Sequence, residues 1–291
     1  MKILKSLTIV IIAIALTGCS DLTIKQEKKN PWTHLNLYND PANFQFAIVA
    51  DRTGWMRPGV FEKAVESLTL LKPEFVMSVG DLIEGYNEDE AKIMAQWNEF
   101  DSMVNKLEMP FFYVPGNHDV TNEVMAKIWR KKMGRLYYHF LYHNVLFLCI
   151  DSEDPPQAHE ADNIGDKQMK YFKKVLAAYP NVRWTLLFLH KPMWHRDKGS
   201  WAKMEKLLAD REYTVFTGHE HRYQKEIRNG RRYYALATTG GVGSGENGQL
   251  EGIEKGQFDH IVWVTMTDDG PVMTNLMLDG IFDDYPPAQK K

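Results

Sequence analysis

One segment decides the fold: residues 44–54 read FQFAIVADRTG. Its first part, residues 44–50, is a short apolar run without a charge, and Asp51 is the first of the residues that end it. A run of this length that stops at polar residues and a glycine predicts a buried strand followed by a turn.

The same arrangement recurs further along the chain. Residues 60–71 have helical spacing, residues 75–79 form a second apolar run, residues 89–106 have the pattern of a long amphipathic helix, and residues 111–114 are apolar again. Strands that alternate with helices in this way predict stacked β-α-β units.

The second half of the chain predicts more strands than helices. Asn229-Gly230 indicates a tight hairpin, because both positions of such a turn favour positive φ. The expected strands are residues 145–150, 183–189, 213–217, 223–228, 231–237, 260–267 and 272–278, with a helix near 201–208. We therefore predict an α/β fold (α+β in some schemes), built as a four-layer sandwich of two mixed β-sheets flanked by helices.

The composition is that of an ordinary globular protein. Of 291 residues, 44% are hydrophobic and 25% are charged, and only 2 are cysteine, which excludes a disordered chain and a disulfide-stapled miniprotein. The net charge is −3 and the chain has no long basic run, so no nucleic-acid partner is expected.

The N-terminus has the pattern of an export signal. Lys2 and Lys5 precede an apolar stretch, residues 7–16, which is too short to span a bilayer. Residues 16–19 read LTGC and resemble the bacterial lipobox, in which cleavage precedes the cysteine and its thiol is lipidated. An ordinary signal peptide with an incidental cysteine, and an uncleaved anchor, are the alternatives.

This interpretation divides the chain into four parts. Residues 1–18 are a lipoprotein signal peptide, residues 19–42 the lipidated Cys19 with a polar tether, residues 43–281 the folded domain, and residues 282–291 a tail. The protein is then expected to be exported and held by lipid in the cell envelope, at the outer membrane or periplasmic face if the cell has two membranes. Cys149 lies in an apolar run and is expected to be a buried core residue.

Polar side chains follow the ends of five predicted strands. A single aspartate there is usually a turn or a helix cap, and a single histidine is usually a surface or core residue. Because the carboxyl ends of parallel strands meet at one edge of a sheet, their combination indicates a shared site. The residues are Asp51, Asp81, Asn117, His118, Asp119, His190, His219 and His221.

In this order, from about residue 44 to residue 223, these residues resemble the calcineurin-like metallophosphoesterases. The resemblance implies that Asp51 and His221 bind a first metal ion and that Asp81 bridges to a second. It also implies that Asn117, His190 and His219 complete the second site. His118 matches the family's non-ligand histidine, which is held by Asp119 and assists at the scissile phosphate or the leaving group.

The chemistry of the residues agrees with this resemblance. Two cations that share a bridging carboxylate can lower the pKa of water and neutralise phosphate oxygens. Mixed histidine, aspartate and asparagine ligands suit Mn, Fe or Zn better than Ca, and do not choose among the three. Two divalent or trivalent transition-metal ions are therefore the expected cofactors.

The first motif departs from the family pattern. The family usually has Asp-x-His, but Thr53 stands at the histidine position, and a hydroxyl is a poor ligand. A water, another side chain, or a weakly bound first metal are the possible consequences. Purple acid phosphatases, which also lack this histidine, have a tyrosine three residues after the bridging aspartate, where this chain has Glu84. Glu84 is thus a candidate ligand, or it caps its loop or holds a metal ligand by a hydrogen bond.

Three further features lie close to the site segments in sequence. Arg52 could clamp a substrate phosphate or form an outward salt bridge. Trp55 and Trp194 lie close in sequence to site segments, and Trp194 could stack on a substrate base or ring, although a lid or core role is the more usual one for it. Residues 240–256 are rich in glycine without a P-loop or dinucleotide pattern, and form a loop beside the site or on the surface.

These observations predict a binuclear metal-dependent hydrolase of phosphate mono- or diesters that acts on a small phosphorylated substrate outside the cytoplasm. The alternative is a non-catalytic or weakly catalytic envelope lipoprotein that uses the same fold for ligand binding. Thr53 favours the alternative, and the retained set of costly polar residues favours the enzyme.

Overall fold

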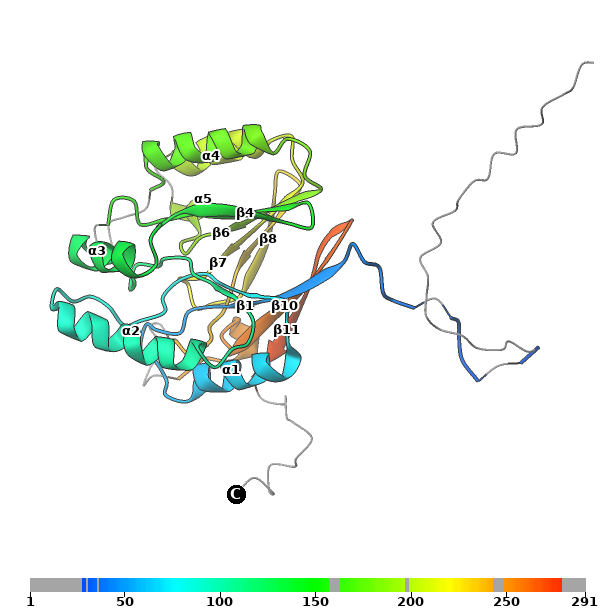
Figure 1. The fold of residues 1–291 in the computed structure, drawn as a ribbon, viewed down its shortest axis with the longest axis horizontal. Coiled ribbons are helices and arrows are strands. Elements are labelled where there is room, and N and C mark those ends of the chain that lie inside the picture. The colour runs from blue at the N-terminus through cyan, green and yellow to red at the C-terminus, as the bar shows by residue number, and fades with distance from the viewer. Residues whose placement is uncertain are drawn as a thin grey trace, which may run out of the picture. The chain divides into compact units, whose positions relative to one another are not determined.

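Strand β1, Phe44–Val49, connects the two kinds of pairing in the first sheet of the computed structural model (Figure 1). It runs parallel to β2, Val76–Ser78, which is parallel to β3, Phe111–Phe112. On its other side it is antiparallel to β10, His260–Thr267, which pairs with β11, Gly270–Met277. The sheet order is β11-β10-β1-β2-β3.

The second sheet is mixed as well, with the order β4-β5-β6-β7-β9-β8. Strands β5, β6, β7 and β9 are parallel, and the two edge strands are antiparallel to their neighbours. The strands are β4 Tyr138–Tyr142, β5 Val145–Cys149, β6 Trp184–Phe188, β7 Tyr213–Thr217, β8 Gln224–Arg228 and β9 Arg231–Ala235.

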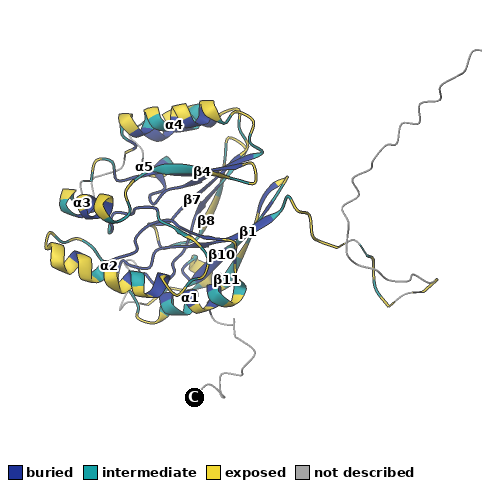
Figure 2. Cartoon of the chain, viewed as in Figure 1, coloured by how far each residue is buried: buried dark blue, intermediate teal, exposed yellow. Residues whose placement is uncertain are grey.

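The alternation of side chains along β1 sets the layers. Phe44, Phe46 and Ile48 enter the core between the two sheets, whereas Ala47 and Val49 enter a core on the other face of the first sheet. Helices α1 (Val60–Leu71), α2 (Glu90–Val104) and α3 (Glu123–Lys132) contribute to that outer core. On the far face of the second sheet, α4 (Asp166–Ala178), α5 (Met193–Arg196) and α6 (Ser200–Leu208) do the same. Figure 2 shows that the helices turn their buried faces inward and that the central strands are buried, whereas β4, β8 and β11 are partly exposed.

The structure describes residues 28–29, 31–35, 37–156, 163–196, 199–242 and 249–278. It divides the chain into two units, Met1–Asp40 and Pro41–Lys291, and the layers above belong to the second. The expected signal peptide, Cys19, the C-terminal tail and residues 243–248 of the glycine-rich loop lie outside the described residues. Among the helices within the described ranges, none has the length and apolar character needed to cross a membrane.

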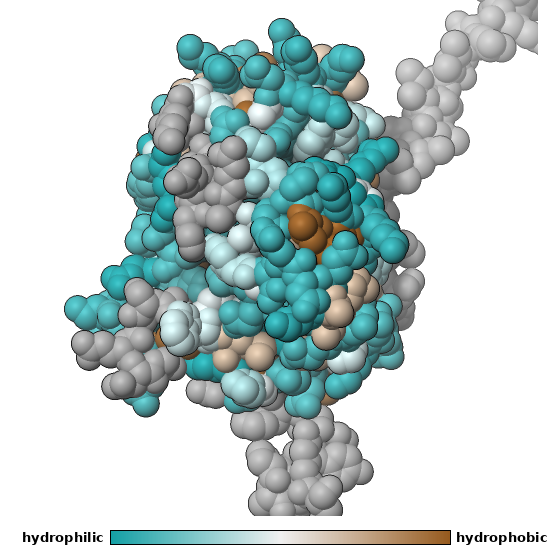
Figure 3. Space-filling view, turned by 90° about the vertical axis from the view of Figure 1, so that its left-hand side faces the viewer, coloured by the Kyte–Doolittle hydropathy of each residue, from teal (hydrophilic) through white to brown (hydrophobic). Residues whose placement is uncertain are grey.

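The predicted fold class is confirmed, with differences in individual elements. Helices α3 and α4 and strand β4 were not predicted. The third strand is shorter than predicted, because the Val114 amide donates to the Ser78 hydroxyl at 3.0 Å instead of continuing the ladder. Cys149 is buried, as expected. The face in Figure 3 is mostly hydrophilic, with a small apolar patch inside a hydrophilic ring.

Candidate metal centre

The carboxyl ends of the parallel strands deliver the predicted ligands. Asp51 follows β1, Asp81 follows β2 and Asn117 follows the short β3, while His190 follows β6 and the His219–His221 segment follows β7. All of these strands are parallel within their sheets, so their ends meet at one edge, as expected for sites in open α/β sheets. Residues far apart in sequence are thereby brought together.

Three of these residues have a left-handed backbone. The φ angle is 57° at Asp81, 73° at His219 and 48° at His221. For a residue other than glycine this conformation costs about 1–2 kcal/mol, and such costs concentrate at functional sites. Local backbone strain thus accompanies the orientation of these three side chains toward the pocket.

Two glycines allow the carboxylates to sit against the backbone. A Cβ on Gly116 would lie 2.3 Å from Asp81 Oδ1, and a Cβ on Gly218 would lie 2.2 Å from Asp51 Oδ2. Neither position has room for a larger residue. The Gly116-Asn117 and Gly218-His219 pairs are thus part of the construction of the site.

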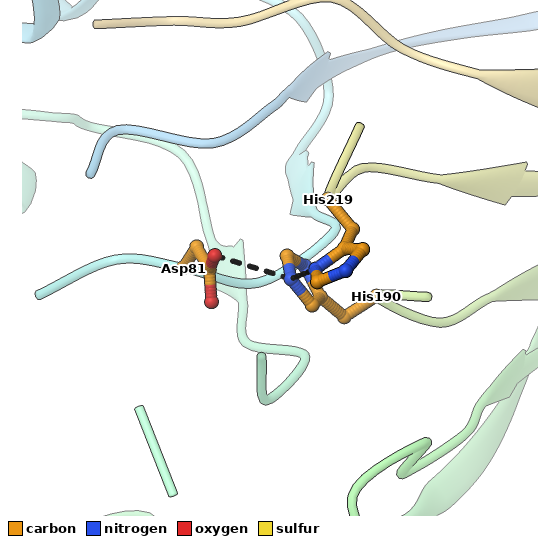
Figure 4. A group of neighbouring side chains, drawn as sticks. All are labelled: Asp81, His190 and His219. Atoms are coloured by element: carbon orange, nitrogen blue, oxygen red, sulfur yellow. Dashed lines mark hydrogen bonds and ion pairs between the residues drawn. The ribbon is translucent and has the colours of Figure 1, made fainter. Parts of the chain in front are cut away.

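One group of donor atoms converges on Nε2 of His190. This nitrogen lies 3.1 Å from Asp81 Oδ2, 2.9 Å from Asn117 Oδ1 and 3.1 Å from His219 Nδ1, and Figure 4 shows three of these side chains facing one another. The other ring nitrogen of His190, Nδ1, is 2.9 Å from the Val79 carbonyl and donates its hydrogen there. Because Nδ1 carries that hydrogen, Nε2 is the ring nitrogen that faces the group.

The amide of Asn117 is oriented in a similar way. Its Nδ2 donates to the Tyr86 hydroxyl at 2.9 Å, which leaves Oδ1 to face His190. Four donors of the predicted second metal site therefore point at one position, as a bound cation requires.

A second group consists of Asp51, Asp81 and His221, whose ligand atoms lie within 4.8 Å of one another. Asp81 belongs to both groups. Asp51 Oδ2, His221 Nδ1 and Thr53 Oγ1 are buried and have no hydrogen-bond partner among the described residues. Unsatisfied buried polar atoms are costly, so this cluster needs a further partner.

The charges of the site favour a cation. Burial opposes ionisation of Asp81, but His190 and His118 outweigh it and hold the pKa of that carboxyl below its usual range. Burial alone would lower the pKa of His190, yet Asp81 and Asp51 raise it to about 10. The pKa of the Asp51 carboxyl is raised by burial, which exceeds the opposing influence of His221. Buried carboxylates thus stabilise positive charge at this position.

The donor set fits two transition-metal ions. Carboxylate and amide oxygens with imidazole nitrogens suit Mn, Fe or Zn, and the shared Asp81 is placed to bridge. The two groups are unequal, because the first has three acidic or imidazole ligands and the second has a fourth donor in Asn117.

His118 reaches the pocket without belonging to either donor group. Its Nδ1 lies 2.7 Å from the Glu84 carbonyl, and its Nε2 lies 3.9 Å from Asp81 Oδ2. The ring of Tyr86 meets its ring edge-on at 4.7 Å. These contacts fix the ring and leave Nε2 on the pocket side.

The expected role of Asp119 is corrected. Its carboxylate accepts from the backbone amides of Asp81, Leu82, Ile83 and Gly116 at 2.8–3.2 Å. No hydrogen bond joins it to His118 among the residues that the structure describes. Burial, and then Asp81, raise the pKa of Asp119 to about 7, against the influence of its backbone hydrogen bonds. Asp119 therefore holds the turn after β2 against the turn after β3, and the Glu84 carbonyl orients His118.

Arg52 is also corrected, because it does not face the pocket as a phosphate clamp would. Its guanidinium donates to the Leu82 carbonyl at 3.0 Å and to Glu99 on α2 at 2.5 Å, and its side chain is 3% exposed. It lies over the Phe61 and Phe100 rings. Arg52 joins the site loop to the outer helices.

Glu84 caps a loop and is not a metal ligand in this structure. Its Oε1 accepts from the Met56 amide at 2.8 Å and so caps the loop that follows Asp51. It belongs to neither donor group found among the described residues. Within the described residues, no further carboxylate therefore joins the first donor group in place of the histidine that usually stands at position 53.

The remaining candidates take different positions. Trp194 packs in the core of the second sheet with Tyr233 and donates to Glu226, so it is a structural residue. The start of the glycine-rich loop belongs to the site, because the Gly241 amide donates to the Asp51 carbonyl at 3.1 Å.

Members of both donor groups line a cavity of about 880 Å³, namely Asp81, Asn117, His219 and His221. Trp55 and Met56 line it together with Tyr86, which the sequence did not single out. An aromatic residue in the loop directly after the bridging Asp81 was the signal that could have identified Tyr86.

The sequence model of the calcineurin-like phosphoesterases matches residues 19–223 of this chain. The chain belongs to this family. The match extends over most of the chain and includes every residue of the two donor groups, so the predicted family membership is confirmed.

Individual relatives of the family are distant. A probable glycerophosphodiester phosphodiesterase of Arcobacter nitrofigilis is 22% identical over 173 residues, which are 54% of this chain and 60% of that protein. The matched part thus spans less than two thirds of the relative.

Solved structures share the fold at low identity. A dimetal phosphatase from Danio rerio has a TM-score of 0.58 at 12% identity, covering 81% of this chain and 96% of that one. Purple acid phosphatase from yellow lupin has a TM-score of 0.59 at 14% identity, covering 83% of this chain and 53% of that one. GAP50, the anchor in the inner membrane complex of Plasmodium, has a TM-score of 0.60 at 16% identity, covering 84% of this chain and 87% of that one.

Proposed function

We propose that this protein is a metal-dependent phosphoesterase that hydrolyses a small phosphorylated substrate outside the cytoplasm. One observation carries the proposal: two groups of buried donor atoms share Asp81 at the floor of an open cavity. Family membership supports the reaction class, and the donor set supports a pair of transition-metal ions.

The residues divide into those that would bind the metal ions and one that transfers a proton. Asp51, Asp81 and His221 would hold the first ion, and Asp81, Asn117, His190 and His219 the second. Bound at the shared carboxylate, such a pair supplies Lewis acidity toward a phosphoryl group and lowers the pKa of water. His118 presents Nε2 to the same space and donates a hydrogen bond or proton to the leaving oxygen, while the Glu84 carbonyl keeps Nδ1 in place.

The site of action follows from the N-terminus. Residues 1–18 have the features of a lipoprotein signal, and lipidation of Cys19 would anchor residues 43–281 through the polar tether 19–42, with residues 282–291 as a tail. The substrate is then one that occurs in the cell envelope or outside the cell.

The second candidate function is ligand binding without turnover. Thr53 favours it, because the first donor group has three ligands and no replacement for the usual histidine within the described residues. A chain that loads one ion or none would have this function.

Metal stoichiometry tests the proposal directly. The purified protein is equilibrated with Mn, Fe or Zn, washed, and assayed by elemental analysis and against a panel of phosphate mono- and diesters. We expect two ions per chain and turnover of at least one ester. Asp81→Asn should lose the shared ligand, bind at most one ion and have no activity, whereas Asp166→Asn, on the exposed face of α4, should match the unchanged protein. Full metal content with full activity in Asp81→Asn would reject the bridging role.

A further inference from the structure

Trp55 is a large aromatic residue held in solvent beside the donor groups. It is 76% exposed although it lines the cavity, and its φ is 67°. It makes no ring contact within the part of the chain that the structure describes. Exposure of an indole and a left-handed backbone are both unfavourable, so neither folding nor packing explains this residue.

The backbone on both sides of Trp55 is fixed. The Gly54 carbonyl accepts from the Val242 amide at 3.0 Å, and the Met56 amide donates to Glu84 at 2.8 Å. The Arg57 amide donates to the Gly240 carbonyl at 2.9 Å. The Arg57 guanidinium donates to both carboxylate oxygens of Asp259, at 2.6 and 2.8 Å. The indole is thus presented by a rigid loop, which lowers the entropy cost of binding against it.

The cavity is larger than a phosphate group requires. Its volume of about 880 Å³ lies in the range of sites for whole small molecules, roughly 300–1,000 Å³. Its lining combines donor residues with the side chains of Trp55, Met56 and Tyr86. A ligand that carries both an anionic group and an apolar group matches this mixed lining.

We propose that Trp55 stacks on a flat aromatic ring in the leaving group, so that the preferred substrates are phosphate esters that carry such a ring, nucleotides among them. This inference rests on the proposed phosphoesterase function and adds the substrate class. An exposed indole offers a flat π face, and a planar ring gains more from that face than a puckered one of similar size. In this arrangement the aromatic ring of the leaving group lies against Trp55 while the phosphate lies at the donor groups.

Three phosphonates with the same anionic head test the proposal. They are benzylphosphonate with a flat ring, cyclohexylmethylphosphonate with a puckered ring, and methylphosphonate with none. Dissociation constants are measured by calorimetry on the Mn-loaded full chain, so the readout is binding and not turnover. Benzylphosphonate should bind about 5- to 100-fold more tightly than methylphosphonate, with the cyclohexyl compound between them.

Variants at position 55 show whether the indole ring causes the tighter binding of benzylphosphonate. Trp55→Ala should reduce the affinity for benzylphosphonate to that for methylphosphonate, without change for methylphosphonate itself. Trp55→Phe should keep most of the preference. Ile227→Ala, at an exposed residue of the β8–β9 hairpin outside the cavity lining, should change nothing.

Trp55→Gly supplies a second, independent readout. Glycine adopts positive φ without strain, so this variant should raise the melting temperature by about 2–4 °C while abolishing the preference for the flat ring. Gain of stability with loss of ring binding identifies a residue kept for the ligand and not for the fold.

Each other outcome overturns a defined statement. Equal affinity for benzyl- and methylphosphonate, or an undiminished preference in Trp55→Ala, rejects the role of Trp55 and leaves the phosphoesterase proposal intact. Equal affinity for the flat and puckered rings rejects an aromatic ligand in favour of an aliphatic one. If none of the phosphonates binds, the proposed function itself fails, and this inference fails with it.

Discussion

At the scale of single residues, His118 and the metal donors have separable roles. The imidazole of His118 has Nε2 3.9 Å from Asp81 Oδ2 and Nδ1 at the Glu84 carbonyl, and only the backbone amide of His118 donates to Asp81, at 3.0 Å. Its substitution should therefore affect proton transfer and leave the donor groups unchanged.

His118→Ala is expected to keep the metal content of the unchanged protein and to lower kcat roughly 10²–10⁴-fold, the usual contribution of a general acid or base. Elemental analysis and initial rates on the best ester measure the two effects on one preparation. Loss of metal together with activity would contradict the separation and make His118 part of the donor set.

His260 shows a different use of a buried histidine. It accepts from the Ala237 amide through Nε2 at 3.2 Å, so Nδ1 carries the hydrogen and donates to Asn275 at 3.1 Å. Burial lowers the pKa of His260 to about 4, below the value near 6.5 of an unfolded chain. The unfolded state therefore takes up this proton first as the pH falls.

The free energy of unfolding should consequently decrease as the pH falls from 6.5 to 4, by about 3 kcal/mol from this residue. Urea unfolding of the unchanged protein and of His260→Gln at pH 7, 6, 5 and 4 isolates its share. The difference in stability between the two proteins should shift across this window. A constant difference would mean that His260 has the same pKa in the folded and unfolded states.

At the scale of elements, the loops after β5 and β6 are joined by a buried ion pair beside the centre. Lys191 Nζ lies 2.9 Å from Glu153 Oε2, and both side chains are 1% exposed. Ser152 supports the pair, because its hydroxyl donates to Glu153 and accepts from the Lys191 amide. Since Lys191 follows His190 directly, this contact also supports the imidazole.

Glu153→Gln is expected to destabilise the fold by about 3–5 kcal/mol, because it removes the carboxylate charge that the buried Lys191 ammonium contacts at 2.9 Å. Adding Lys191→Met should restore most of that loss, since the double variant buries no charge. Denaturant midpoints of the two single variants and the double variant give the coupling. Additive losses would show that the pair does not act as a unit.

At the scale of the whole molecule, the chain combines a folded domain with an N-terminal segment whose sequence predicts export. The two parts meet at residues 40 and 41 in the structural division. Membrane attachment is thus expected to depend on the N-terminal segment and not on the domain.

Cys19→Ser should move the protein from the membrane fraction to the soluble fraction without changing its catalytic constants. Fractionation of cells, followed by assay of each fraction, measures both properties. If Cys19→Ser stays in the membrane, the segment is an uncleaved anchor. If the unchanged protein is found in the soluble fraction, no lipid anchor is present.

The sequence determined much of the fold and of the donor set. Apolar runs that end in aspartate, asparagine or histidine specify buried strands locally, and parallel strands bring their carboxyl ends together by geometry alone. Helices α3 and α4 were missed. In α3, charged residues interrupt the apolar pattern, and its stability comes from packing Trp129 and its neighbours against the outer core.

Only the tertiary structure decided what each neighbouring side chain does. Arg52 turned from the pocket because Glu99, 47 residues away, accepts its guanidinium, and Asp119 bound the turn 36–38 residues before it instead of His118. The exposed position of Trp55 likewise depends on Val242 and on Glu84. Strand formation depends on the residues of the strand itself, whereas the partner of a polar side chain depends on which distant loops fold beside it. That is why the sequence located the metal centre and the structure assigned its surrounding residues.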